Sequence, residues 1–158
     1  DRAEGLRVRS NTTLILHGAR FVFTDDLAGD GQAFRGDDVR NVRVEGGMVI
    51  GQRGSWDPGT NIAGLRLYGD CGNIHIAGMR FEDLSSNGIG ILGADAKHPV
   101  EDVWIRDVVT RNCCNYYGDY LADVVGPAKG SDRTDQGNIA LYHVERWVVE
   151  GCDLDGSQ

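Results

Sequence analysis

Residues 73–81 read Asn73-Ile74-His75-Ile76-Ala77-Gly78-Met79-Arg80-Phe81. In this stretch an alternating pair, Ile74 and Ile76, is followed by a glycine and then by a second alternating pair, Met79 and Phe81. Alternation of apolar and polar residues is typical of a half-buried β-strand, and glycine supplies the backbone freedom that a tight corner needs. The stretch therefore predicts a strand, a bend and a second strand.

The same unit recurs along the chain. We place a frame at Thr13, Asn41, Asn73, Asp102 and Arg146, with spacings of 28, 32, 29 and 44 residues. The residues one and three places after each frame point are all apolar: Leu14/Leu16, Val42/Val44, Ile74/Ile76, Val103/Ile105 and Trp147/Val149. A third strand precedes several frame points, at Leu65/Leu67, Ile89/Ile91 and Ile139/Leu141.

Three short strands per unit bury their inward rows only when the units stack. The repeat therefore predicts an all-β protein, a right-handed parallel β-helix of roughly five turns. We expect residues 1–158 to form a single β-helix segment, with an insertion at 115–137 where the spacing lengthens to 44 residues.

Composition agrees with this fold. The 158 residues include 23 glycines, only two lysines and six glutamates, so the residues that favour helices are scarce. The net charge of −8 argues against a nucleic-acid partner, which calls for a basic footprint. The sequence contains no apolar run of the length that a membrane helix requires, and we expect no membrane partner.

One segment leaves an alternative open. Residues 100–117 contain no glycine or proline, and Val100, Val103, Trp104 and Val108 match a helical stripe. The β-branched content and the agreement of Val103 and Ile105 with the other units favour a strand.

The cysteines, one tryptophan and two histidines carry further expectations. The cysteines Cys71, Cys113, Cys114 and Cys152 lack metal-binding spacing and are interpreted as small buried side chains, with a Cys113–Cys114 vicinal disulfide as the alternative. Cys152 and Trp147 occupy inward rows, so we expect a buried thiol and a core tryptophan. His17 and His75 lie on strands without a visible partner and are interpreted as structural.

The units resemble a known superfamily. Residues 10–19 and 41–52, with Trp56 shortly after, resemble an early turn of the pectin-degrading β-helix enzymes. Residues 73–81 resemble a generic turn of the pectate-lyase-like superfamily. The resemblance covers nearly the whole chain and implies a polysaccharide partner and a secreted, periplasmic or cell-surface location. It also implies further residues before and after this segment, or another chain, to cap the ends of the solenoid.

The resemblance places substrate on the sheet that contains residues 87–91. Alternation then points Arg66, Tyr68 and Tyr142 outward, with His143 at the end of its strand. The 115–137 insertion is expected to wall this face, since insertions in solenoids gather on one side.

Two reactions and one non-catalytic role follow from this placement. An inverting hydrolase needs paired aspartates on consecutive strands; residues 87–91 have none, and Asp119 and Asp123 are the best substitutes. A lyase needs a cation to neutralise a carboxylate, for which Arg66, Lys129 and Arg133 are candidates, and a base, for which Tyr142 or His143 is expected. The sequence slightly favours the lyase on an acidic, uronate-containing polysaccharide; the alternative is a structural or carbohydrate-binding β-helix module.

Two smaller expectations complete the candidate site. Trp104 points outward and is the tryptophan best placed to stack on a sugar ring. Calcium is compatible with the 18 aspartates, but the sequence carries no calcium-loop pattern and assigns no metal ligand.

Overall fold

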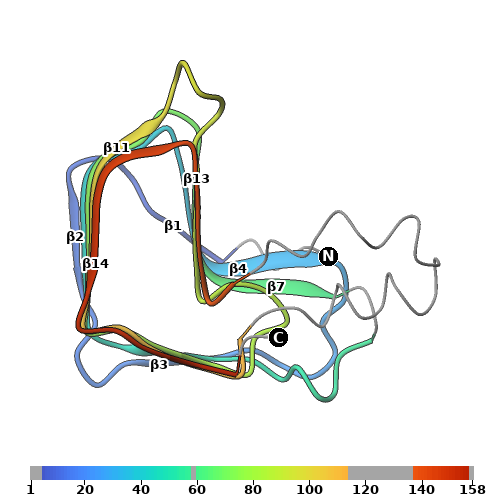
Figure 1. Cartoon of the computed structure of the whole chain (residues 1–158). Helices are drawn as coiled ribbons and strands as arrows, with labels where there is room; N and C mark the ends of the chain where they lie inside the picture. The colour runs from blue at the N-terminus through green and yellow to red at the C-terminus, as the bar shows by residue number, and fades with distance from the viewer. Residues whose placement is uncertain (1–4, 58–59, 114–136, 157–158) are drawn as a thin grey trace.

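The computed structural model describes residues 5–57, 60–113 and 137–156, and within these ranges the chain forms strands and no helix. The strands make three parallel sheets of five (Figure 1). Sheet A contains β1 (Leu6–Arg7), β4 (Asp30–Asp37), β7 (Asn61–Tyr68), β10 (Ile89–Leu92) and β13 (Ile139–Tyr142). Sheet B contains β2 (Thr12–Ile15), β5 (Arg40–Glu45), β8 (Gly72–Ala77), β11 (Val100–Arg106) and β14 (Val144–Glu150). Sheet C contains β3 (Arg20–Val22), β6 (Met48–Ile50), β9 (Arg80–Glu82), β12 (Val109–Arg111) and β15 (Asp153–Asp155).

Each coil contributes one strand to every sheet, and successive coils stack in register. The chain is therefore a right-handed parallel β-helix of about five turns, as the repeat predicted. The helix considered for residues 100–117 is wrong for the part that the structure describes, because residues 100–106 form β11 and pair with β8 on one side and β14 on the other. Pairing on both sides supplies backbone hydrogen bonds that outweigh the weak helical stripe.

The register corrects the predicted frame in the first coil. Thr12 pairs with Val42 and Leu14 with Val44, so the residue equivalent to Asn41 is Asn11 and not Thr13. Phe21 nevertheless pairs with Val49, and these residues come eight places after Thr13 and Asn41. The corner between sheets B and C is thus two residues longer in the first coil. The predicted frame point of that coil was therefore placed two residues too late, at Thr13 instead of Asn11.

Sharp corners between the sheets depend on left-handed backbone. At the corner that leads into sheet B, φ is between 52° and 58° at every coil: Asn11, Asn41, Asn73, Asp102 and Arg146. Asparagine adopts this conformation more readily than most residues. The side chains also bond from coil to coil: Asn41 Nδ2 donates to Asn11 Oδ1 at 2.8 Å, and Asn73 Nδ2 donates to Asn41 Oδ1 at 2.9 Å. We call these three residues the asparagine ladder.

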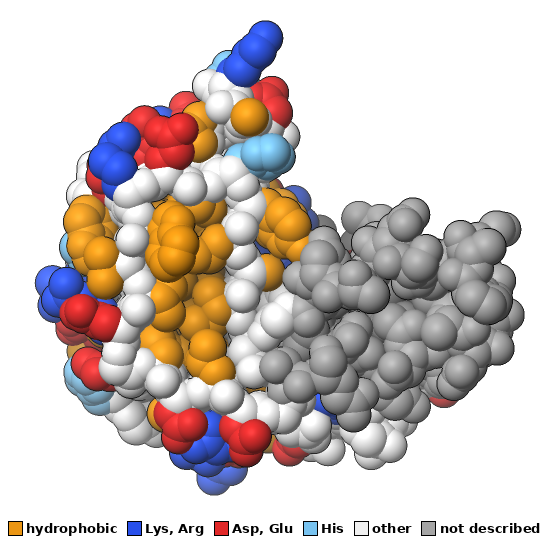
Figure 2. Space-filling model, in the orientation of Figure 1, with side chains coloured by type: hydrophobic (Ala, Val, Ile, Leu, Met, Phe, Trp, Pro, Cys, Tyr) orange, Lys and Arg blue, Asp and Glu red, His pale blue; other side chains and the backbone are white. Residues whose placement is uncertain are grey.

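The core is a set of inward rows that run along the solenoid. The rows include Phe34, Leu65 and Ile89; Val42, Ile74 and Val103; Val44, Ile76 and Ile105; and Val49 and Phe81, all at most 1% exposed. Figure 2 looks along the axis onto one end and shows apolar side chains filling the coil, with charged side chains outside it.

In the last coil the inward rows are less buried than predicted. Trp147 pairs with Val103 and Leu154 with Thr110, yet Trp147 is 55% exposed and Leu154 45% exposed. The prediction that Trp147 is a core residue is therefore wrong, and Cys152 is only half-buried. The physical reason is that no described strand lies beyond β13, β14 and β15 to cover them.

Three cysteines lie in the described part of the chain, and all are free thiols. Cys71 and Cys113 are buried, as expected for small apolar side chains, and Cys114, the other member of the vicinal pair, lies outside the described residues. Burial raises the pKa of the Cys113 thiol to about 11. None of the described residues forms a helix that is long and apolar enough to cross a membrane.

Candidate functional site

The outer face of sheet A carries two rows of side chains that run along the solenoid axis. The strand register places Arg7, Arg35 and Arg66 side by side on β1, β4 and β7, and we call these residues the arginine row. The row continues with Gly90 and Ala140, which have almost no side chain. The second row is Asp37, Tyr68, Leu92 and Tyr142.

Local sequence explains why the arginines face outward. Each arginine lies between two residues at inward-facing positions of its strand: Leu6-Arg7-Val8, Phe34-Arg35-Gly36 and Leu65-Arg66-Leu67. Because side chains alternate along a strand, burying Phe34 and Leu65 turns the arginines to the other face. Neighbouring strands lie about 4.8 Å apart, so the three side chains start at that spacing.

One carboxylate forms ion pairs with two of the arginines. Asp37 forms ion pairs with Arg7 at 2.7 Å and with Arg35 at 2.9 Å. These contacts, the Arg35 hydrogen bond first, lower the pKa of Asp37 below its usual value. The Arg35 guanidinium also lies 5.0 Å from the centre of the Tyr68 ring, within cation–π range.

Arg66 differs from its neighbours because it is buried, with only 7% of its surface exposed. Its Nη2 donates to Asn61 Oδ1 at 3.0 Å and to Ser86 Oγ at 2.7 Å. Asn61 Nδ2 in turn donates to Asp30 Oδ1 at 2.7 Å. Arg66 lies on the outer face, as expected, but its side chain is buried there, and the guanidinium links Asn61 at the start of β7 to Ser86 just before β10.

A hollow opens beside the beginning of the arginine row. It has a volume of about 480 Å³ and is lined by Arg7, Arg9, Asp37 and Asp38, together with Val8, Ser10 and Val39. Two arginines and two aspartates can offer both hydrogen-bond donors and acceptors to a polar ligand.

Of the other residues predicted for the site, Tyr68 shares the outer face of β7 with Arg66, and the rest lie farther away. Tyr142 is half-buried in β13 and pairs with Leu92, so two strand spacings, about 10 Å, separate it from the β7 row. His143 follows β13, is exposed and has a φ of 49°. Tyr68 is half-buried next to Arg35, and Trp104 is half-buried on sheet B, not on sheet A. Asp119, Asp123, Lys129 and Arg133 lie outside the described residues.

Sequence reasoning missed Arg7, Arg35 and Asp37. The predicted third strand was recognised only at Leu65, Ile89 and Ile139, so β1 and β4 were not aligned with it. The signal that could have found them is the shared alternation, an apolar residue followed by arginine, at Leu6-Arg7, Phe34-Arg35 and Leu65-Arg66.

The described residues place no cluster of three or more His, Cys, Asp or Glu side chains that could hold a metal ion. The outer face of sheet A offers a ligand the arginines, the ring of Tyr68 and the hollow. Among the described residues no calcium ligands are assigned there.

The fold and this face define a class, a right-handed parallel β-helix with a basic outward row on one sheet. No protein-family profile, no curated protein and no solved structure matches the chain.

Proposed function

We propose that the protein binds an acidic, uronate-containing polysaccharide along the arginine row of sheet A. The observation that carries the proposal is the register that sets the more exposed Arg7 and Arg35 side by side on consecutive strands, beside the buried Arg66, in a chain whose net charge is −8. A row that crosses the strands suits a polymer that lies along the solenoid axis. Guanidinium groups match carboxylates in shape and charge, and the Tyr68 ring beside Arg35 offers an apolar surface to a sugar.

The ion pairs already present do not prevent this binding. Arg7 and Arg35 share Asp37, and the side chain of Arg7 is 55% exposed. Exposed ion pairs contribute only about 0–1 kcal/mol, so exchanging one for a polymer carboxylate costs little. Once one carboxylate of the polymer is bound, the next carboxylate is held near the neighbouring arginine at a high effective concentration. The binding free energies of successive carboxylates therefore add.

The test compares binding of polygalacturonate by the wild-type protein and by a double variant, Arg7→Ala/Arg35→Ala. We expect the double variant to bind at least about tenfold more weakly, since two charge-assisted contacts are lost. The matched control is Arg20→Ala/Arg80→Ala, which removes two outward arginines from sheet C and should bind like the wild type. Equal affinities of the wild type and the sheet A variant, or equal binding of a neutral galactan, would contradict the proposal.

The arginine row also favours a second candidate, β-elimination on the same face. A guanidinium that neutralises the uronate carboxylate acidifies the adjacent C–H proton, which a base removes while the glycosidic oxygen leaves with its electron pair. Tyr68, Tyr142 and His143 are the candidate bases. Absorbance of the unsaturated uronate product, followed with and without calcium, tests elimination. New reducing ends without that absorbance would indicate hydrolysis, and binding without any product would leave a carbohydrate-binding module.

A further inference from the structure

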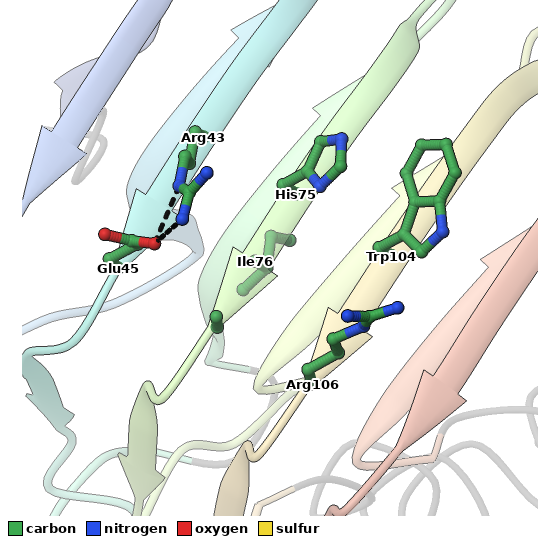
Figure 3. A pocket seen from close by; sticks show the side chains of 7 residues that line it. Arg43, Glu45, His75, Ile76, Trp104 and Arg106 are labelled. Atoms are coloured by element: carbon green, nitrogen blue, oxygen red, sulfur yellow. Dashed lines mark hydrogen bonds and ion pairs between the residues drawn. The ribbon is translucent and has the colours of Figure 1, made fainter.

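The outer face of sheet B carries a second hollow, over Ala77 (Figure 3). The outward rows here are Arg43, His75 and Trp104, and beside them Glu45, Ala77 and Arg106. Because Ala77 is far smaller than Glu45 and Arg106 on either side of it, the face is hollowed between them, with a volume of about 200 Å³.

Two stacked rings form a wall of this hollow. The centres of the His75 and Trp104 rings are 4.4 Å apart, and their planes differ by 15°. His75 Nε2 lies 3.0 Å from Asn73 Oδ1, an arrangement in which Nε2–H donates to the amide oxygen. Asn73 belongs to the asparagine ladder, so the fold itself holds the imidazole in place. The indole N–H of Trp104 takes part in none of the hydrogen bonds found among the described residues.

Two arginines stand on opposite sides of the hollow. Arg43 comes from β5 and forms an ion pair with Glu45, and Arg106 comes from β11 and pairs with Glu150 at 2.9 Å. Both arginine side chains are at least half exposed. Exposed pairs of this kind are weak, so either guanidinium can turn toward a ligand at small cost.

We propose that the hollow over Ala77 binds the oxyanionic substituent of a sugar, a carboxylate or a sulfate. Arg43 and Arg106 bind the oxyanion from two sides, and the Trp104 indole N–H and its ring edge contact the sugar. The volume is below the roughly 300 Å³ at which pockets for larger ligands begin, so the hollow takes one charged group and not a length of polymer. This site lies on sheet B and is independent of the arginine row on sheet A.

Glu45 allows a specific test, because its carboxylate lies on the rim of the hollow and competes with the ligand for Arg43. The Glu45→Gln variant removes that competition and should bind the oxyanion about threefold or more tightly, which corresponds to one exposed ion pair. Ala77→Leu fills the hollow from an outward strand position and should abolish saturable binding while the fold is kept. Glu82→Gln is the matched control, because Glu82 pairs with Arg80 on sheet C in the same way.

The experiment is an NMR titration of the protein with sodium sulfate, sodium galacturonate and neutral galactose at constant ionic strength, observing the Trp104 indole N–H and the His75 ring. We expect saturable shifts with galacturonate, sulfate or both, and which of them binds identifies the oxyanion. The Arg7→Ala/Arg35→Ala variant should bind like the wild type, so this result is separate from the function proposed for sheet A. The proposal is overturned if neither oxyanion gives a saturable shift, if galactose binds equally well, if Ala77→Leu binds normally, or if Glu45→Gln gains nothing over Glu82→Gln.

Discussion

Asn73 joins two features of the molecule at a single residue. Its left-handed backbone turns the chain into sheet B, its Nδ2 donates to Asn41, and its Oδ1 contacts the His75 imidazole. The side chain that stabilises the corner therefore also orients a ring of the hollow over Ala77. Such double use is possible because residues 73 and 75 lie on the same side of β8.

His75 should make stability depend on pH. Burial, followed by the positive charges of Arg43 and Arg106, lowers the pKa of His75 below 6.5, and Glu45 is the carboxylate that lines the same hollow. The native state then binds fewer protons than the unfolded state, so stability falls as the pH drops below about 6.5. Urea unfolding at pH 7.5 and pH 5 should show a smaller loss for His75→Gln than for the wild type. An identical loss in both proteins would show that His75 does not contribute.

A substitution at Thr110 should stabilise the protein, whereas most substitutions in the core destabilise it. Thr110 is fully buried, and its Oγ1 has no hydrogen-bond partner among the residues that the structure describes. Thr110→Val keeps the shape of the side chain and removes the unpaired hydroxyl, so we expect the free energy of unfolding to rise by about 1 kcal/mol. Ser85→Ala is the contrast: Ser85 Oγ accepts from the Ile62 N–H at 2.9 Å, and its loss should cost about 1–3 kcal/mol. Chemical denaturation measures both, and a less stable Thr110→Val would contradict this account.

For Arg66 and His75 the position on the strand could be predicted from sequence, but the surroundings of the side chain could not. Alternation placed Arg66 on the outer face, and the register agrees. Its burial depends on Asn61 and Ser86, which approach it from other parts of the chain. Likewise, the sequence around His75 shows no partner for its ring, because Trp104 belongs to the next coil and lies beside His75 only when the coils stack.

At the scale of elements, the repeat predicted strands of sheets B and C because their inward rows are mostly apolar, with Thr110 as an exception in sheet C. It missed β1 and β4 of sheet A, since β4 (Asp30–Asp37) begins with aspartate, glycine and glutamine and contains a second glycine. The arginine row crosses β1 and β4, so missing these strands also hid most of the candidate site.

The asparagine ladder should contribute measurably to the stability of the solenoid. Asn41 bonds to both ladder neighbours and has a φ of 57°. Asn41→Ala loses these bonds and places a β-carbon in left-handed backbone, so we expect a loss of about 2–3 kcal/mol. Asn41→Gly removes the same bonds without that strain and should be about 1 kcal/mol less costly. Denaturant unfolding compares the two, and a glycine variant that is no more stable than the alanine variant would contradict the backbone part of the argument.

At the scale of the whole molecule, the three sheets present different surfaces. Sheet A carries the arginine row, sheet B carries the stacked rings and the hollow over Ala77, and sheet C carries cross-strand and same-strand ion pairs such as Arg80–Glu82 and Arg111–Asp153. A protein with a net charge of −8 can therefore still attract an anion to one face, because charge is distributed unevenly around the coil. Attraction of this kind is screened by salt, with a Debye length of about 10 Å at 0.1 M.

Mapping by NMR tests the central claim, that an acidic polysaccharide lies along the arginine row. A short oligogalacturonate is added to the wild-type protein, and the side-chain N–H signals of arginine and the ring signals of tyrosine are followed to saturation. We expect the largest changes at Arg7, Arg35 and Tyr68 on sheet A, and we expect them to shrink as salt is raised. Changes confined to Arg80 and Arg111 on sheet C, or no saturable change at all, would contradict it.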